Sequence, residues 1–132
     1  MSAGELMHSK LVATAGVSTR VSADMRAAGT ALPCIVYEIK TNELLTTLQA
    51  SVTNTWKASV DCHIIAQTLA ECATVAAAIV TGFEGATWTG SYGTAIRSTI
   101  EGQVNGVIDD STPGATDLTR TITVTILLFH KD

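Results

Sequence analysis

Two stretches of the chain alternate apolar and polar residues, and each predicts a strand with one buried face. From Trp56 to Ile65 the even positions are Trp56, Ala58, Val60, Cys62 and Ile64, and the odd positions include Lys57, Ser59, Asp61 and His63. Near the C-terminus, the apolar positions Ile122, Val124, Ile126 and Leu128 alternate with Thr119, Thr121, Thr123 and Thr125. Because successive strand side chains point to opposite faces, both patterns indicate a sheet with one face on a core.

Three further strands are predicted from shorter signals. A short strand ends at Arg20-Val21, and the β-favouring run that follows Pro33 contributes Ile35, Tyr37 and Ile39. A weaker strand contains Ile96 and Ile100, separated by Ser98.

Two helices are predicted from their first residues. Ser2-Ala-Gly-Glu5 and Thr68-Leu-Ala-Glu71 both have the spacing of a capping box. The first helix is expected from about Ala3 to Ala15, ended by Gly16. The second is expected to bury one apolar stripe and to end near two glycines, Gly82 and Gly85. The stripe consists of Leu69, Cys72, Ala73, Ala76, Val80 and Phe83.

The order of these elements predicts an α+β fold. A mainly antiparallel sheet of about five strands carries both helices on one face. The length of 132 residues suits one domain, spanning residues 1–132, with one hydrophobic core.

Two connections are longer than a hairpin requires. The first, Thr41 to Thr55, places Leu44, Leu45 and Leu48 among polar residues, which indicates either a projecting arm or a segment that packs on a neighbour. The second, Asn105 to Asp117, is acidic and contains Pro113-Gly114, so it predicts turns.

The charge pattern disfavours tight nucleic-acid binding. Eight basic residues against twelve acidic residues give a formal net charge of -4, and the basic residues are scattered singly. Charged residues are only 15% of the chain, which is low for a free monomer and suggests a homo-oligomer or a larger complex. The apolar segment from Cys72 to Phe83 is too short for a bilayer, and the N-terminus does not resemble a secretion signal, so the chain is expected to stay where it is made.

The cysteines and histidines do not form a recognisable catalytic or metal motif. Cys34, Cys62 and Cys72 are odd in number and lack a CxxC pair, so buried, reduced thiols are expected. His8, His63 and His130 lie on different predicted elements, which favours solvated or interface histidines over a zinc site. Cys62 and His63 are adjacent in a strand and therefore point to opposite faces.

The remaining candidates for chemistry also favour structural interpretations. The run Thr81 to Gly93 is glycine-rich but lacks the ending of a phosphate loop and is not a nucleophile elbow. Trp88 and Tyr92 are expected to cover the edge of the core, and Asp109-Asp110 to be solvated. We therefore expect no enzyme, no cofactor and no bound metal.

The chain resembles the tail-completion or tail-terminator family of long-tailed bacteriophages. The resemblance begins with Gly16 to Ile39, GVSTRVSADMRAAGTALPCIVYEI, in which Arg20-Val21 closes a short strand and Leu32-Pro33 precedes the strand that bears Tyr37. The strand Trp56 to Ile65, the helix at Thr68 and a closing β-pair follow in the family's order.

This resemblance implies a structural virion protein of the tail or neck, assembled in the host cytoplasm. Such proteins form a hexameric ring that caps the tail tube, stops its polymerisation and meets the head connector or stopper protein. DNA passes through the lumen of the ring without specific binding. The family has no invariant site that can be transferred to positions of this chain, and the resemblance implies no membrane contact.

A ring protein needs three kinds of surface, and the sequence offers a candidate for each. Leu44, Leu45 and Leu48 are expected to grip a neighbouring subunit or the tube. Leu127 and Phe129, apolar on the polar side of the last strand, are expected at the subunit seam. Acidic residues would repel DNA phosphates from the lumen, and the candidates are Asp109, Asp110 and Asp117.

Two alternatives remain open from the sequence. One is a head-completion or connector ring of the same neck assembly. The other, of a different class, is a small cytosolic ligand-binding or catalytic α+β domain with a pocket near Cys62, His63, Trp88 and Tyr92.

Overall fold

The computed structural model describes residues 3–14, 16, 20–23, 33–44, 55–91, 93–109 and 118–131. The elements follow the order α1 (Ala3–Thr14), β1 (Val21–Ala23), β2 (Cys34–Leu44), β3 (Thr55–Ala66), α2 (Leu69–Phe83), β4 (Trp88–Thr89), β5 (Thr94–Asp109) and β6 (Leu118–Lys131).

The strands form one six-stranded sheet in the order β1-β2-β3-β6-β5-β4. The neighbouring pairs are antiparallel except β1 and β2, which run parallel. The α+β fold is therefore confirmed, but the prediction of about five mainly antiparallel strands is only roughly right. The additional strand is β4, whose two residues are too few to show a sequence period.

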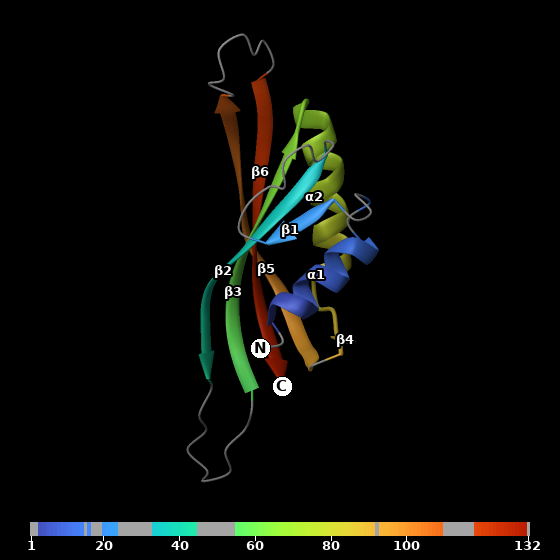
Figure 1. The fold of residues 1–132 in the computed structure, drawn as a ribbon, viewed down its shortest axis with the longest axis vertical. Helices are drawn as coiled ribbons and strands as arrows, with labels where there is room; N and C mark the ends of the chain where they lie inside the picture. The colour runs from blue at the N-terminus through green and yellow to red at the C-terminus, as the bar shows by residue number, and fades with distance from the viewer. Residues whose placement is uncertain are drawn as a thin grey trace.

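Both helices lie on the same face of the sheet (Figure 1). We call this the inner face and the opposite one the outer face. The core fills the space between the helices and the inner face: Leu6, Met7 and Leu11 of α1 pack with Ile79 and Phe83 of α2 against the sheet. The predicted inward residues of β6, Ile122, Val124, Ile126 and Leu128, are all buried, as are Ala58, Val60, Cys62 and Ile64 of β3.

The second helix begins as predicted, and it buries the predicted stripe in part. Thr68 is the N-cap, and its hydroxyl accepts a hydrogen bond from the Glu71 amide at 3.2 Å. The buried residues are Cys72, Val75, Ala76, Ile79 and Phe83. Cys72, Ala76 and Phe83 confirm the predicted stripe in part, but Leu69 is 48% exposed and Ala73 is exposed. The buried face is rotated toward the larger Val75 and Ile79.

The first helix ends at Thr14, and Gly16 has the positive φ expected of a helix-ending glycine, 76°. The two helices contact each other where Gly82 of α2 lies against Thr14; a Cβ on Gly82 would be 3.1 Å from the Thr14 Cβ. A small residue at this position therefore lets the helices approach closely.

Both long hairpins extend further than predicted. β2 continues through Thr41 to Leu44, which pairs with Trp56 of β3, so the predicted connection from Thr41 is too long. β5 continues to Asp109, opposite Leu118, so Asn105 to Asp109 are strand and not turn. Cross-strand backbone pairing supports these polar residues in extended conformation, a contribution that local composition does not reveal.

Two irregularities interrupt the register of β5. The register shifts between Ala95 and Arg97 and again between Ile100 and Gly102. Ile96, at the first shift, is 42% exposed, whereas Ser98 is fully buried and Ile100 packs against the core. The Ser98 hydroxyl donates a hydrogen bond to the Phe83 carbonyl, which satisfies a polar group in the core.

Candidate functional site: the outer sheet face and its edges

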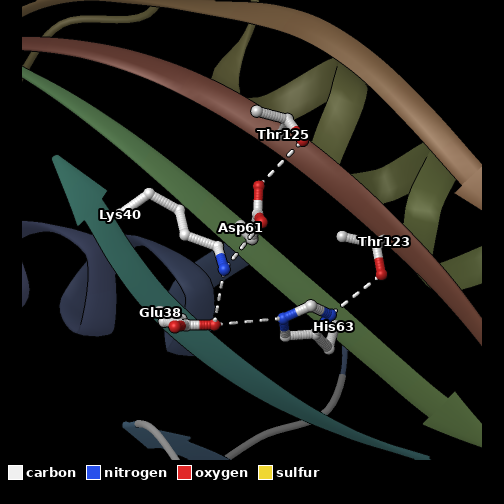
Figure 2. Close-up of polar contacts among 6 residues, drawn as sticks. All are labelled: Glu38, Lys40, Asp61, His63, Thr123 and Thr125. Carbon is white, nitrogen blue, oxygen red and sulfur yellow. Dashed lines mark hydrogen bonds and ion pairs between the residues drawn. The ribbon is translucent and has the colours of Figure 1, made fainter.

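Six side chains form a polar network on the outer face of the sheet (Figure 2). They come from three neighbouring strands: Glu38 and Lys40 of β2, Asp61 and His63 of β3, and Thr123 and Thr125 of β6. The register sets Glu38 opposite Asp61, Asp61 opposite Thr125 and His63 opposite Thr123. Cross-strand neighbours on one face are close enough to interact, which explains how the network forms.

Lys40 joins the two carboxylates of this network. Its Nζ lies 3.3 Å from Glu38 Oε2 and 3.9 Å from Asp61 Oδ2. The Thr125 hydroxyl donates to Asp61 Oδ1 at 2.9 Å. Because the Lys40 and Glu38 side chains are about half exposed, their ion pair adds little to stability and mainly fixes the arrangement of charges on the surface.

His63 connects the network to β6. Its Nδ1 lies 2.9 Å from the Thr123 hydroxyl, and its Nε2 lies 3.7 Å from Glu38 Oε2. The side chain is 35% exposed, which agrees with a partly solvated histidine. The arrangement holds an imidazole between a carboxylate and a hydroxyl on an open surface, and such a surface suits recognition of a protein partner.

Leu127 and Phe129 lie on the outer face, closer to the C-terminal end of β6 than the network residues Thr123 and Thr125. They are half-buried, and they are flanked by Ser59 and Lys57 on β3. On β5, Val104 faces the same side opposite Thr123 and is 69% exposed. The outer face thus combines a polar centre with apolar residues on β5 and β6, a pattern common in surfaces that bind other proteins.

The other predicted contact residues lie mostly outside the described residues. Leu44 ends β2 and is 43% exposed, but Leu45 and Leu48 are not described. Asp109 is the last residue of β5, and Asp110 and Asp117 are not described. Leu44 and Asp109 each end the strand that enters a long hairpin connection, and the structure places them on different hairpins.

The residues of the predicted ligand pocket do not converge. Cys62 is fully buried on the inner face, and His63 lies on the outer face, as strand geometry predicts. Burial raises the pKa of the Cys62 thiol to about 12, and the charge of Asp61 adds to the rise. Such a thiol stays protonated and is a poor nucleophile. Tyr92, the remaining aromatic of that set, is not described.

Trp88 covers the edge of the core as expected, with partners that the sequence does not reveal. Its indole N–H donates to the Leu6 carbonyl at 3.0 Å, and its ring packs edge-to-face on Phe83. The Lys10 ammonium lies 5.4 Å from the ring centroid. Trp88 therefore ties β4 to α1 and is not available for stacking with a ligand.

The histidines are separated, but one of them was assigned wrongly. His8 is exposed on α1, whereas His130 is fully buried on β6 and is not a solvated or interface residue. His130 Nε2 lies 3.0 Å from Asn42 Oδ1 across the sheet. Inward-facing polar residues at the sheet's end pair with each other, which a sequence period cannot indicate. Among the described residues, no three His, Cys, Asp or Glu side chains could hold a metal ion together.

A hollow of about 420 Å³ lies where α1 begins beside β2. It is lined by Ala3, Gly4, Ile39, Lys40, Thr41 and Asn42. Its lining is mostly apolar, and its one charged side chain, Lys40, is engaged by Glu38 and Asp61 on the outer face. The hollow therefore lacks the convergent polar groups of a specific small-molecule site.

The two sides of the sheet are only partly covered by neighbouring strands. β1 pairs with Ile35, Val36 and Tyr37 of β2, and no described strand pairs with β2 beyond Tyr37 on that side. β4 pairs with Thr94 and Ala95 of β5, and no described strand continues that pairing toward Asp109. In the described part of the chain, no helix is long and apolar enough to cross a membrane.

No protein-family model matches the chain, and no curated protein matches it. Among solved structures, the fold is similar to that of a chain described as part of the virion of a native gene transfer agent (GTA) particle. The TM-score is 0.61 at 14% identity, over 92% of this chain and 84% of that chain. At this identity the similarity establishes the shared fold.

Proposed function

We propose that this chain is a structural protein of a bacteriophage-type virion. The observation that carries the proposal is the fold similarity to a virion chain, which extends over 92% of the residues. The sequence resemblance to tail-completion proteins was based on the order of strands and helices, and it points to the same class of particle. The low content of charged residues, 15%, suits a chain that buries surface in an assembly.

Within that class, we propose the role of tail terminator. The chain forms a ring, with six copies by analogy with the family, that caps the tail tube, ends its polymerisation and meets the head connector. It carries no catalytic role or cofactor, and its assembly in the host cytoplasm precedes joining to the head. The support is the family's order of elements, together with an outer sheet face and two long hairpins that offer several separate surfaces (Figure 1).

The contact residues remain those proposed from the sequence. Leu44, with Leu45 and Leu48, contacts a neighbouring subunit or the tube, and its 43% exposure leaves apolar area to bury. Leu127 and Phe129 contribute to a subunit contact from the outer face. Asp109, Asp110 and Asp117 face the lumen, where negative charge keeps DNA from binding.

The direct experiment is electron microscopy of the purified protein mixed with growing tubes of the tube protein from the same genome. Caps at one tube end with arrested growth support the terminator role. Uncapped tubes that continue to grow contradict it. Binding to purified connectors without effect on tubes indicates the alternative, a head-completion or connector ring of the same neck.

A pair of matched variants tests the arm within this experiment. The double substitution Leu44→Asp and Leu45→Asp places charges where apolar contact is proposed, so a folded protein that no longer caps tubes is expected. The control is Leu69→Asp, because Leu69 has a similar exposure of 48% on α2 and an acidic residue suits a helix start. Normal capping by the double variant would refute the role of the arm.

A further inference from the structure

We propose that the β5 edge from Gly102 to Asp109 binds the β2 edge from Glu38 to Leu44 of a second copy of this chain. Each copy then adds its sheet to that of the next by antiparallel strand pairing. This inference rests on the proposed ring, because a ring needs two different, complementary surfaces on every subunit.

The two edges lie on opposite sides of one sheet. In the order β1-β2-β3-β6-β5-β4, the only described strands outside β2 and β5 are very short, β1 and β4 respectively. Consequently, the free segments span seven residues on β2 and eight on β5, a near match in length. An open row of copies paired in this way has an unpaired β2 segment at one end and an unpaired β5 segment at the other. Closing the row into a ring pairs these two segments with each other.

The strand register shows that the two free segments begin at the same level of the sheet and extend from it in opposite directions. Glu38 and Gly102 both lie at the level of Thr125, through Asp61 in the first case and directly in the second. From this level, the free segment of β2 runs toward the level of His130, and that of β5 runs toward the level of Leu118. Pairing the free segments therefore shifts neighbouring copies along the strands, so that β1 and β4 do not collide.

A shift of this kind is also what closure requires. Strands in a closed sheet tilt against the axis, and the tilt appears as a stagger in the strand register. The centres of the two free segments differ by about six residues along β6, or roughly 20 Å at the rise of a strand. Within the continuous sheet the repeat is the four strands β2, β3, β6 and β5, so the stagger is about 1.5 residues per strand, and tilted strands of closed barrels show a stagger of this kind.

Strand direction favours the same pairing. β2 and β6 are each antiparallel to β3, and β5 is antiparallel to β6, so β5 and β2 run in opposite directions. Copies related by rotation about a ring axis keep their strand directions relative to that axis. The β5 edge of one copy therefore meets the β2 edge of the next in the antiparallel orientation.

The backbone of β5 has groups directed to its free side. The Ser98 N–H donates to the Ala86 carbonyl and the Ile100 N–H to Glu84 Oε2, so both point away from β6. Ser98 and Ile100 are opposite even-numbered residues of β6, Leu128 and Ile126. By strand alternation, the backbone N–H groups of the residues opposite the next even positions are also directed away from β6, and these residues are Gln103, Asn105, Val107 and Asp109.

The two free edges differ in how well they are protected against unspecific strand pairing. The β2 segment has a register shift between Ile39 and Thr41 and carries Lys40, both of which discourage indiscriminate pairing. In contrast, the β5 segment from Gly102 to Asp109 contains one charged residue, at its end, and neither lysine nor proline. Pairing of β5 with another β5 would bring Glu101 of each copy toward the partner's Asp109, so like charges oppose that arrangement.

A cross-link between copies tests the pairing directly. Thr41 and Val104 are exposed and lie on the outer face near the centres of the two free segments. The double variant Thr41→Cys/Val104→Cys, oxidised with copper-phenanthroline, should give a reducible ladder of products larger than dimers. The three natural thiols are buried and should not contribute. The matched control is Thr41→Cys/Ala73→Cys, because Ala73 is exposed on α2, away from both edges.

A proline substitution tests the role of the free amides. Asn105→Pro removes one outward N–H without removing a hydrogen bond to β6, so the monomer should still fold. The protein concentration needed for oligomerisation should rise at least tenfold. Asn105→Thr keeps the N–H and is expected to assemble normally. Circular dichroism checks folding, and native mass spectrometry measures the number of copies in each assembly.

The possible results separate this inference from the proposed function. The ladder together with loss of assembly in Asn105→Pro supports the edge pairing. Capping rings without the cross-link overturn the pairing and leave the terminator role intact. Dimers from Val104→Cys alone also overturn it, because they indicate β5 paired with β5. A wild-type protein that neither assembles nor caps tubes rejects both.

Discussion

The carboxylate of Glu5 lies against Gly90 so closely that a Cβ on Gly90 would overlap Glu5 Oε2. Glu5 Oε1 accepts a hydrogen bond from the Ser91 amide at 3.0 Å, and this contact joins α1 to the turn between β4 and β5. The absence of a side chain at Gly90 leaves the space that the Glu5 carboxylate occupies.

Gly90→Ala is expected to lower the free energy of unfolding by about 1 kcal/mol. The flexible Glu5 side chain can move away from the new methyl group, so the main loss is its hydrogen bond to Ser91. Urea denaturation measures the change. Gly102→Ala is the control, because a Cβ there meets nothing within 4 Å. In a Glu5→Ala background, the effect of Gly90→Ala should largely disappear; an unchanged effect would contradict this explanation.

Thr68→Ala is expected to destabilise the protein by about 1 kcal/mol, because α2 loses its N-cap. The Thr68 hydroxyl accepts from the Glu71 amide at 3.2 Å, and alanine cannot replace it. Thr74→Ala, on an exposed turn of the same helix, should change stability by less than about 0.5 kcal/mol. Thermal denaturation followed by circular dichroism compares the two variants, and equal melting temperatures would argue against the capping role.

Stability should decline in alkaline solution through Cys62. Its pKa is raised from 9.0 to about 12 in the folded chain, chiefly by burial. The unfolded chain therefore releases this proton first, and the stabilisation present below about pH 9 is lost at up to ~1.4 kcal/mol per pH unit as pH rises toward 12. Cys62→Ala should be less stable at pH 8 but should show a shallower decline above pH 9. Parallel curves for the two proteins would refute this assignment.

Asn42→Ala should cost about 1–3 kcal/mol, because the fully buried His130 loses its 3.0 Å contact with Asn42 Oδ1. Chemical denaturation provides the measurement. Thr41→Ala, on the adjacent exposed residue, is the matched control and is expected to be nearly neutral. If both substitutions have the same small effect, the buried pair contributes less than its geometry indicates.

The sequence predicted those features in which a local pattern and the tertiary environment agree. The alternation along β3 and β6 identified the buried face. Alternate residues of a strand share a face, so the apolar set must be the one that faces the core. Thr68 began the second helix, and Gly16 followed the first, since caps satisfy nearby backbone groups. The α+β class followed from the order of these elements.

The features that depend on contacts between distant residues were decided by the tertiary structure alone. The register shifts of β5 exposed Ile96 and buried Ser98, since a single extra residue changes the phase of a strand. His130 contacts Asn42, and Glu5 contacts Gly90, although the members of each pair are far apart in the sequence and no local pattern predicts these contacts. The outer-face network and the two half-covered edges likewise exist only once β2, β3, β5 and β6 are side by side. Chemistry along the chain determined which segments form strands and helices, and packing determined which surfaces remain for partners.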